Sequence, residues 1–316
     1  MTAESPRVIP DSDKRRYLLQ YILQSRGVCH ENSLILGLMH LEMDSGTYDS
    51  NWTASDWEKR LGDHIADINV KLSGLNYKVV RCGHGIGRSA VMKKNKQYFN
   101  VNRTGNEGEF EISLPESNRF YVYVNLAFSE EAKLATQFKP DEILFVKWCL
   151  EKFCTQGNVV KACSADRSLG QVQEEVDRML ADLTGDTDVG LKRYVTFTVG
   201  STELSHFDDL SATEIERVLN KLCELKWFYR GERGEFGMDL RTLVELEEYL
   251  VGNFSVPRCQ NCSRAVVQGV QCGSDGDGEE TGRSWHVDCF QHYITHISKD
   301  CDRCGMPLLE NGIYML

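Results

Sequence analysis

Apolar residues in the first 125 positions recur at helical spacing and then alternate as they do in strands. Asp11 or Ser12 can cap the first expected helix, and Gly27 can end it. In segments 77–81 and 120–125 the side chains alternate in character as they do in β-strands. The apolar helical positions are Leu18, Tyr21 and Ile22, then Leu34, Ile35, Leu38 and Leu41, then Leu61, Ile65, Ile68, Leu72 and Leu75. Three helices followed by a two-stranded hairpin are typical of a winged-helix module.

A second helix–helix–hairpin pattern follows. Pro140 suits the first turn of a helix, and Ser211 with Glu214 forms a capping box before another. Segments 227–230 and 235–238 read as a hairpin around a 231–234 turn, and 243–250 as a closing helix. The apolar helical positions are Ile143, Val146, Leu150 and Phe153, then Ile215, Val218, Leu219, Leu222 and Leu225, then Leu243, Leu246, Tyr249 and Leu250. Residues 155–207 are polar apart from a strand-like 194–199, and we interpret them as an insert.

Charge and hydropathy narrow the class of protein. The chain has 316 residues, 41% of them hydrophobic, and a formal net charge of −11. Its apolar runs are far shorter than the roughly 20 residues of a membrane helix, and its first 13 residues lack the apolar stretch of a signal peptide. We therefore expect an intracellular protein with no membrane segment.

Cysteines gather at the C-terminal end. Six of the twelve fall in the last 58 residues, while the others are scattered among mostly apolar neighbours, as buried thiols are. The ligand-type residues follow the pattern Cys259-x2-Cys262-x9-Cys272-x13-His286-x2-Cys289-x11-Cys301-x2-Cys304. Two intervening residues let a pair of side chains bind one tetrahedral zinc ion. A segment this small and polar would depend on metal for its folding.

A ring-type cross-brace pairs these residues alternately and predicts two zinc ions. The first ion takes cluster 1, which consists of Cys259, Cys262, His286 and Cys289. The second takes cluster 2, which consists of Cys272, Cys301 and Cys304 and lacks a fourth ligand. The candidates for this ligand are water and the side chains of Asp275, Asp277, Glu279, Glu280, His292 and His296. Three ligands with a water are also typical of catalytic zinc. No general base accompanies cluster 2, and our hypothesis is a weaker, structural second site.

The predicted fold is α+β. Residues 11–127 form a winged-helix module with a basic hairpin insert, and residues 128–255 form a second one with the polar insert 155–207. Residues 256–316 form a small zinc-binding variant RING cross-brace domain.

One stretch of the chain is strongly basic. Residues 68–106 contain no Asp or Glu but eight cationic residues, which are Lys71, Lys78, Arg81, Arg88, Lys93, Lys94, Lys96 and Arg103. Such a hairpin could neutralise nucleic-acid phosphates, with Tyr98 and Phe99 available for stacking on bases. The alternative is a solvated hairpin that only lacks acids. Glycines at 83, 85 and 87 lack the Gly-Lys-Ser/Thr ending of a phosphate loop, and we interpret them as a turn.

Several motifs together resemble one known family. They are Tyr-Val-Tyr-Val-Asn-Leu-Ala at 121–127, Ala-Thr-Gln-Phe at 135–138, Leu-Lys-Trp at 225–227, Gly-Glu-Phe at 234–236 and the Cys/His array. These motifs, in this order, resemble those of the ring-finger subunits, or first non-SMC elements, of the SMC five–six complex. The resemblance implies a nuclear, chromosome-associated subunit that binds a MAGE-type third element, a kleisin fourth element and the SMC five–six ATPase.

The resemblance also implies a RING-type ubiquitin ligase that presents a charged conjugating enzyme. The residues facing that enzyme would be Phe290, Tyr293, Met306 and Pro307. This chain departs from the family at one ring position, since Thr281 stands nearest the family's fourth Cys ligand. It also departs from active ring modules in general, where an apolar residue is usual in place of Gln260 or Asn261, a proline is common in place of Asp302, and a basic residue is common in place of Gly305. A non-catalytic scaffold therefore stays open as the alternative, with DNA contact through residues 71–103.

Overall fold

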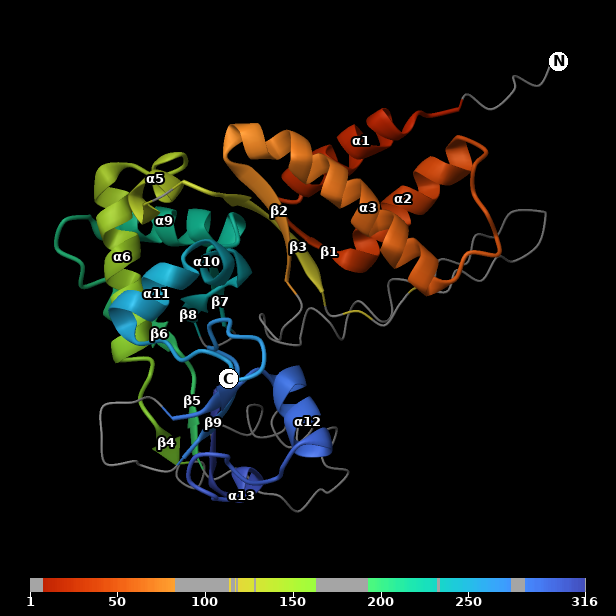
Figure 1. The fold of residues 1–316 in the computed structure, drawn as a ribbon. Coiled ribbons are helices and arrows are strands. Elements are labelled where there is room, and N and C mark those ends of the chain that lie inside the picture. Colours follow the sequence, from red (N-terminus) through yellow and green to blue (C-terminus); the bar gives the residue numbers. More distant parts are fainter. Residues whose placement is uncertain are drawn as a thin grey trace. The chain divides into compact units, whose positions relative to one another are not determined.

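The computed structural model divides the described part of the chain into two compact units, one ending at Lys133 and one beginning at Leu134 (Figure 1). The structure describes residues 8–82, 114, 117, 119–127, 129–162, 193–231, 234–273 and 282–315. No helix in these ranges combines the length and apolar character needed to cross a bilayer. The mixture of helices and sheets confirms the predicted α+β class.

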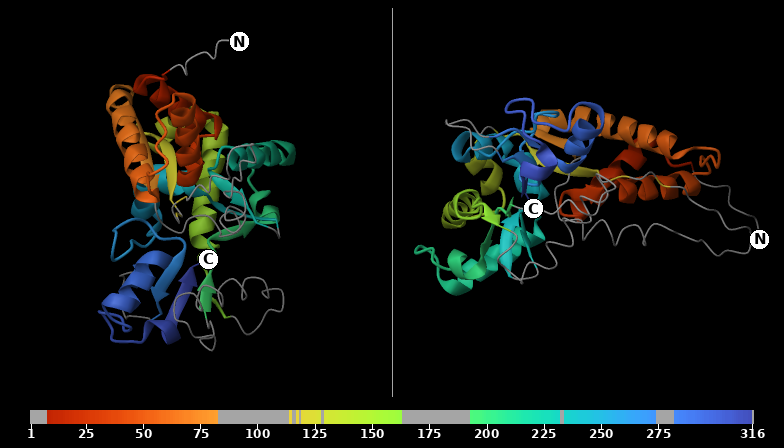
Figure 2. Two further views of the ribbon diagram at one scale, coloured as in Figure 1. Left: turned by 90° about the vertical axis from the view of Figure 1, so that its right-hand side faces the viewer. Right: turned by 90° about the horizontal axis from the view of Figure 1, so that it is seen from below.

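The first unit has winged-helix topology. Its helices pack together beside a sheet of order β1-β3-β2 (Figure 2). The sheet is antiparallel, with Val28 opposite Val122 and Tyr77 opposite Asn125. The elements are α1 (Asp11–Gln24), β1 (Val28–His30), α2 (Glu31–Asp44), α3 (Ala54–Leu72), η1 (Ser73–Leu75), β2 (Tyr77–Cys82) and β3 (Phe120–Asn125). The sequence predicted all of these except β1 and η1.

The helical stripes form the core of the first unit, with three exceptions, one of which is the half-buried Leu41. Leu18, Ile22 and the α3 positions up to Leu72 are buried, whereas Tyr21 is 43% exposed and Leu75 is 66% exposed. Helix α3 ends before Leu75, so that residue leaves the stripe. The predicted cap of α1 is wrong as well. Pro10 occupies the N-cap position in an extended conformation, and no side chain caps the helix.

The second unit contains another winged helix with the same strand order, β6-β8-β7. Its elements are α6 (Pro140–Thr155), β6 (Thr198–Gly200), α8 (Ser201–Leu204), α9 (Ala212–Glu224), β7 (Phe228–Arg230) and β8 (Glu235–Met238). α5 (Glu130–Ala135) precedes them. The predicted capping box of α9 forms, with both bonds between Ser211 and Glu214 present. β6 and α8 come from the segment predicted to be an insert, so part of that segment completes the module.

Two shorter helices replace the predicted closing helix. They are α10 (Leu240–Glu245) and α11 (Glu247–Phe254). Leu246 separates them, because its backbone (φ −109°, ψ 17°) departs from helical values.

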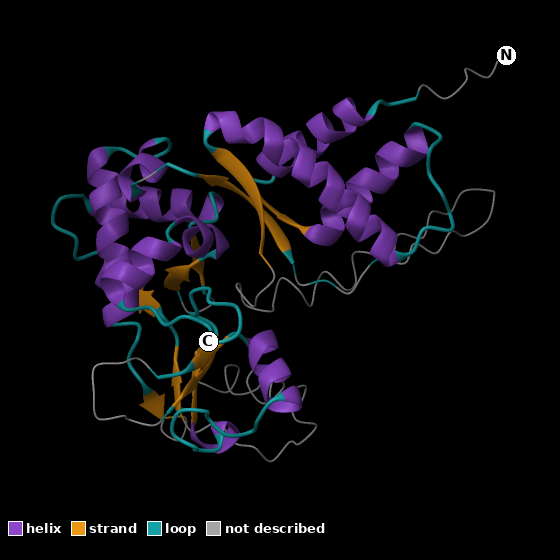
Figure 3. Cartoon of the chain, viewed as in Figure 1, coloured by secondary structure: helices purple, strands orange, loops and turns teal. Residues whose placement is uncertain are grey.

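Residues 256–315, called the C-terminal part below, share a five-stranded sheet with the second winged helix (Figure 3). The sheet order is β10-β9-β11-β5-β4, and β11 lies parallel to β5 with Ile313 opposite Arg193. The elements are β4 (Lys161–Ala162), β5 (Arg193–Val195), β9 (Gly269–Cys272), β10 (Ser284–Trp285), α12 (Val287–His296), α13 (Leu308–Asn311) and β11 (Gly312–Met315). One hydrophobic core runs from Leu134 to Met315. The compact unit therefore continues across the predicted boundary at 255/256.

Candidate metal centre

Cluster 1 brings its four side chains together from two short segments. Cys259 and Cys262 flank a turn, His286 precedes α12 and Cys289 lies in the first turn of that helix. Their ligand atoms all lie within 4.8 Å of one another. Cys259, His286 and Cys289 are each at most 4% exposed. Zinc–sulfur and zinc–nitrogen bonds of ordinary length separate S from N by about 3.5 Å in a tetrahedron. The distance from Cys262 Sγ to His286 Nδ1 is 3.3 Å, which fits a zinc ion bound by both atoms.

A hydrogen bond sets the orientation and tautomer of His286. Its Nε2 lies 3.0 Å from the carbonyl oxygen of Ala265, which can only accept. Nε2 therefore carries the proton and donates it, leaving the Nδ1 lone pair facing the cysteines. Metal-binding histidines commonly donate their other ring N–H to a carbonyl in this way.

The three thiols of cluster 1 change one another's pKa values because they lie close together. Hydrogen bonding from Cys289 lowers the pKa of Cys259 to about 2. The same hydrogen bond, together with burial, raises the pKa of Cys289, and burial raises that of Cys262. A divalent cation would stabilise all three thiolates at once, so the donor chemistry suits zinc.

Cluster 2 joins the end of β9 to a turn before α13. Cys272 comes from β9, and Cys301 and Cys304 flank the turn. The sulfurs of Cys272 and Cys304 are 3.4 Å apart, too far for a disulfide bond of about 2.05 Å and close to the roughly 3.8 Å expected on a shared zinc. Burial raises the pKa of Cys301 to about 11, so a metal must displace a proton there.

The two Cys-x2-Cys turns have the same backbone design. In cluster 1, Ser263 N donates to Cys259 O (2.9 Å) and Cys259 N to Arg264 O (2.8 Å). In cluster 2, Gly305 N donates to Cys301 O (2.8 Å) and Cys301 N to Met306 O (2.9 Å). The residue after each second cysteine is left-handed, with φ of +61° at Ser263 and +68° at Gly305. This left-handed residue lets the chain turn back, so that the backbone of the first cysteine of each pair can bond to the residues after the second.

The described residues supply three donors to cluster 2. His292 and His296 lie on α12, with ring centroids 4.9 Å apart, and neither belongs to the group formed by the three sulfurs. The candidate carboxylates Asp275, Asp277, Glu279 and Glu280 lie outside the described residues.

Comparisons with known proteins agree with this geometry. Residues 15–246 match the family described as "Nse1 non-SMC component of SMC5-6 complex", and residues 259–304 match a RING-like domain. The chain is 49% identical over 320 residues to "Non-structural maintenance of chromosomes element 1" of Saccharomyces cerevisiae, covering 95% of each protein. The chain belongs to the Nse1 family.

More distant members of the Nse1 family match part of the chain. The human and mouse homologs are each 24% identical over 202 residues, which is 61% of this chain and 59% of theirs. A solved structure titled "Nse1-Nse3-Nse4 complex" matches 98% of both chains at 15% identity with a TM-score of 0.55. That likeness extends the Nse1-type fold to nearly the whole chain.

Two of the ring residues predicted to face a conjugating enzyme in this Nse1-family chain are buried. Phe290 is 0% exposed and Tyr293 is 9% exposed, because both pack against Trp285 with ring centroids 6.1 and 5.0 Å away. Burial does not favour direct contact of these two side chains with a partner, and that contact stays a prediction. Met306 is 42% exposed and Pro307 is half-buried, so Met306 is the most accessible of the four.

The predicted nucleic-acid residues fall into three groups. Lys71 and Lys78 are exposed on α3 and β2. Arg81 is engaged within the protein, because it donates to Glu31 Oε1 (2.8 Å) and lies 3.5 Å from Glu58. The other predicted residues, Arg88, Lys93, Lys94, Lys96 and Arg103, lie outside the described residues. Phosphate contact through this stretch stays a prediction.

A third group of potential ligands, which the sequence did not indicate, lies in the first unit. Asp11, Glu42 and His64 come from three different helices and approach within 4.8 Å of one another. Lys14 and Arg60 already pair with Glu42 at 2.6 Å each. Since two protein cations neutralise this buried carboxylate, the group is an ion-pair network rather than a metal site.

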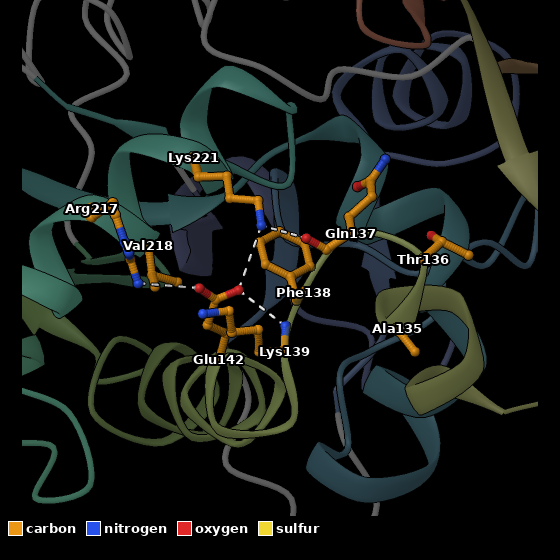
Figure 4. Close-up of a pocket in the computed structure, with 9 residues that line it drawn as sticks. All are labelled: Ala135, Thr136, Gln137, Phe138, Lys139, Glu142, Arg217, Val218 and Lys221. Carbon is orange, nitrogen blue, oxygen red and sulfur yellow. Dashed lines mark hydrogen bonds and ion pairs between the residues drawn. The ribbon is translucent and has the colours of Figure 1, made fainter.

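A pocket of about 510 Å³ lies between the α5–α6 connection and α9 (Figure 4). Glu142 lies at its centre, 3.5 Å from both Arg217 and Lys221 (Figure 4). α9 is the third helix of its winged helix, the element that reads DNA in related folds. Arg217 and Lys221, the pocket cations on α9, are both paired with the carboxylate of Glu142. This face of α9 therefore does not favour phosphate binding. Residues lining the pocket are Ala135, Thr136, Gln137, Phe138, Lys139, Glu142, Arg217, Val218 and Lys221.

Proposed function

We propose that this chain is the RING-type subunit of an SMC5-6 complex, acting on chromosomes in the nucleus. We further propose that it binds a MAGE-type Nse3 subunit and a kleisin Nse4 subunit, and through them the SMC five–six ATPase. Its membership of the Nse1 family and the solved Nse1-Nse3-Nse4 complex with a similar fold support these partners. The interleaving of clusters 1 and 2 carries the assignment of the C-terminal part.

Ubiquitin transfer is the activity we propose for the C-terminal part. A ligase of this type has no nucleophile of its own. It holds a conjugating enzyme so that a substrate lysine attacks the thioester carbonyl, an isopeptide bond forms and the enzyme's thiol leaves. Cluster 1 offers a zinc ion three sulfurs and one nitrogen, which is a closed structural site. The metal would therefore supply rigidity, and the protein surface would supply the positioning.

Met306 carries the proposed contact with the conjugating enzyme. Its side chain is 42% exposed directly beside the cluster 2 turn, and its backbone carbonyl accepts from Cys301 N. A metal-rigidified turn already fixes the backbone of Met306, so binding a partner would cost side-chain but little backbone entropy.

A non-catalytic scaffold is the second candidate. Burial of Phe290 and Tyr293 removes two aromatic side chains from the available surface. The C-terminal part also shares its sheet with the second winged helix through β5 and β11. Such a shared core suits a rigid element that supports partner binding.

A reconstituted ubiquitination assay separates the two candidates. The chain would be co-purified with its Nse3 and Nse4 partners and tested with a panel of conjugating enzymes. We expect Met306→Arg to lower chain formation about tenfold, as for one interface residue worth about 1.4 kcal/mol, with zinc content and partners retained. The matched control Val70→Arg alters another exposed apolar residue (75% exposed, on α3) and should have no effect. If no conjugating enzyme supports transfer by the intact, zinc-loaded complex, the scaffold role is correct.

A further inference from the structure

We propose that Arg193 is a positioning residue for the metal at cluster 2, although it lies far from that cluster in sequence. Arg193 begins β5, in the segment that completes the second winged helix. Its Nη2 donates to the carbonyl oxygens of Gly273 and Asn311, at 3.0 Å each. Gly273 directly follows the ligand Cys272, and Asn311 ends α13. One guanidinium therefore ties the two chain segments that flank the cluster. This inference rests on the proposed metal-dependent C-terminal part.

The packing around these hydrogen bonds leaves no free space. A Cβ atom on Gly273 would lie 2.0 Å from Asn311 O and 2.1 Å from Arg193 Nη2. Only glycine allows the three groups to approach this closely. Because hydrogen bonds from a charged donor are stronger than neutral ones, the arrangement holds the peptide after Cys272 firmly.

The position of Cys272 matters more than that of the other two ligands. Cys301 and Cys304 come from a single turn whose internal hydrogen bonds already orient them. Cys272 is the only described donor of cluster 2 that lies outside this turn, at the end of β9. Pairing with β11 places it opposite Gly312, and its N–H donates to Arg283 O at 2.8 Å. Arg193 fixes the remaining, C-terminal side of this residue.

Groups that orient metal ligands from outside typically contribute about 10- to 100-fold to metal affinity. The structure thus makes the metal affinity of cluster 2 depend on a residue outside the predicted 256–316 domain. Cluster 1 has no comparable described contact with Arg193 and serves as an internal reference.

Zinc release from the whole 316-residue chain tests the proposal. Zinc per chain is counted by native mass spectrometry, and its transfer to excess 4-(2-pyridylazo)resorcinol is followed by absorbance. We expect Arg193→Ala to release one of two zinc ions about tenfold faster than the unmodified chain, with the other unchanged. Arg193→Lys, which retains a charged donor, should release it at an intermediate rate. Arg217→Ala removes an arginine from α9 whose side chain is 61% exposed and should not change either rate.

Repeating the measurement in a chain that also carries Cys304→Ser identifies which of the two ions Arg193 affects. In Cys304→Ser, the retained zinc is that of cluster 1, and adding Arg193→Ala should not change its release. Unchanged release of both ions in the single variants would overturn the proposal, and so would equal acceleration of both, because Arg193 would then support the fold in general. Absence of zinc from the unmodified chain would instead refute the proposed metal-dependent function itself.

Discussion

Clusters 1 and 2 each contain a Cys-x2-Cys turn of the same type, but the surrounding protein encloses them to different degrees. Cluster 1 has four described donors, three of them almost fully buried, and its histidine is oriented by the Ala265 carbonyl. Cluster 2 has three described donors, and Cys304 is exposed. The four ligands of cluster 1 come from residues 259–289, whereas the peptide after the cluster 2 ligand Cys272 is also held by Arg193 of β5. The comparison indicates that repeated sequence spacing does not by itself give equal metal sites.

The largest effect is expected from removing a ligand of cluster 1. His286→Ala should abolish zinc binding at cluster 1 and unfold the C-terminal part, because a structural zinc contributes about 10–16 kcal/mol, which is comparable to or larger than the stability of a whole domain. Native mass spectrometry and limited proteolysis would detect both changes. His206→Ala is the matched control, since this histidine is 66% exposed and lies 3.8 Å from Glu203, outside both clusters. A folded variant that still bound two zinc ions would contradict the account of cluster 1.

Removing a ligand of cluster 2 should have a smaller and more local effect. We expect Cys304→Ser to lower the count from two zinc ions to one while the C-terminal core stays folded, since Cys304 is exposed and the core residues Trp285 and Phe290 pack elsewhere. The number of zinc ions per chain would report the loss of cluster 2, and the tryptophan fluorescence would report whether the core stays folded. Cys223→Ser, at a half-buried cysteine outside both clusters, should keep two ions. Loss of both ions from Cys304→Ser would show that the clusters are not separable.

The smallest effects are expected at the equivalent left-handed positions after each Cys-x2-Cys pair. Gly305→Ala should destabilise the chain by about 1 kcal/mol, because a Cβ is unfavourable at φ +68° even though nothing lies within 4 Å of it. Ser263→Gly, at φ +61°, should stabilise it by up to about 1 kcal/mol for the converse reason. Denaturation midpoints of the zinc-loaded chain would measure both. Shifts of the same sign would contradict the equivalence of the two turns.

Local signals in the sequence were sufficient for much of this structure. The spacing of the Cys/His array predicted which side chains the structure groups together, and the Ser211–Glu214 box located the start of α9. Both depend on residues a few positions apart, whose geometry the nearby backbone determines.

Features that depend on distant residues were not predictable in the same way. β1 is a three-residue strand with no alternating pattern of its own, and it forms by pairing with β3, about ninety residues later in the chain. The pairing of β5 with β11 joins segments more than one hundred residues apart. Phe290 and Tyr293 were assigned to the surface because the position of Trp285, against which they pack, becomes apparent only in the folded core.

Zinc release from the unmodified chain is the decisive test of the difference between clusters 1 and 2. We expect two zinc ions per chain at the start, transferred to a chelator in two phases, with the ion of cluster 2 leaving first. Release of both ions in one phase would contradict the difference between the clusters. A chain without zinc, or one with its C-terminal cysteines joined as disulfides, would contradict the metal centre as a whole.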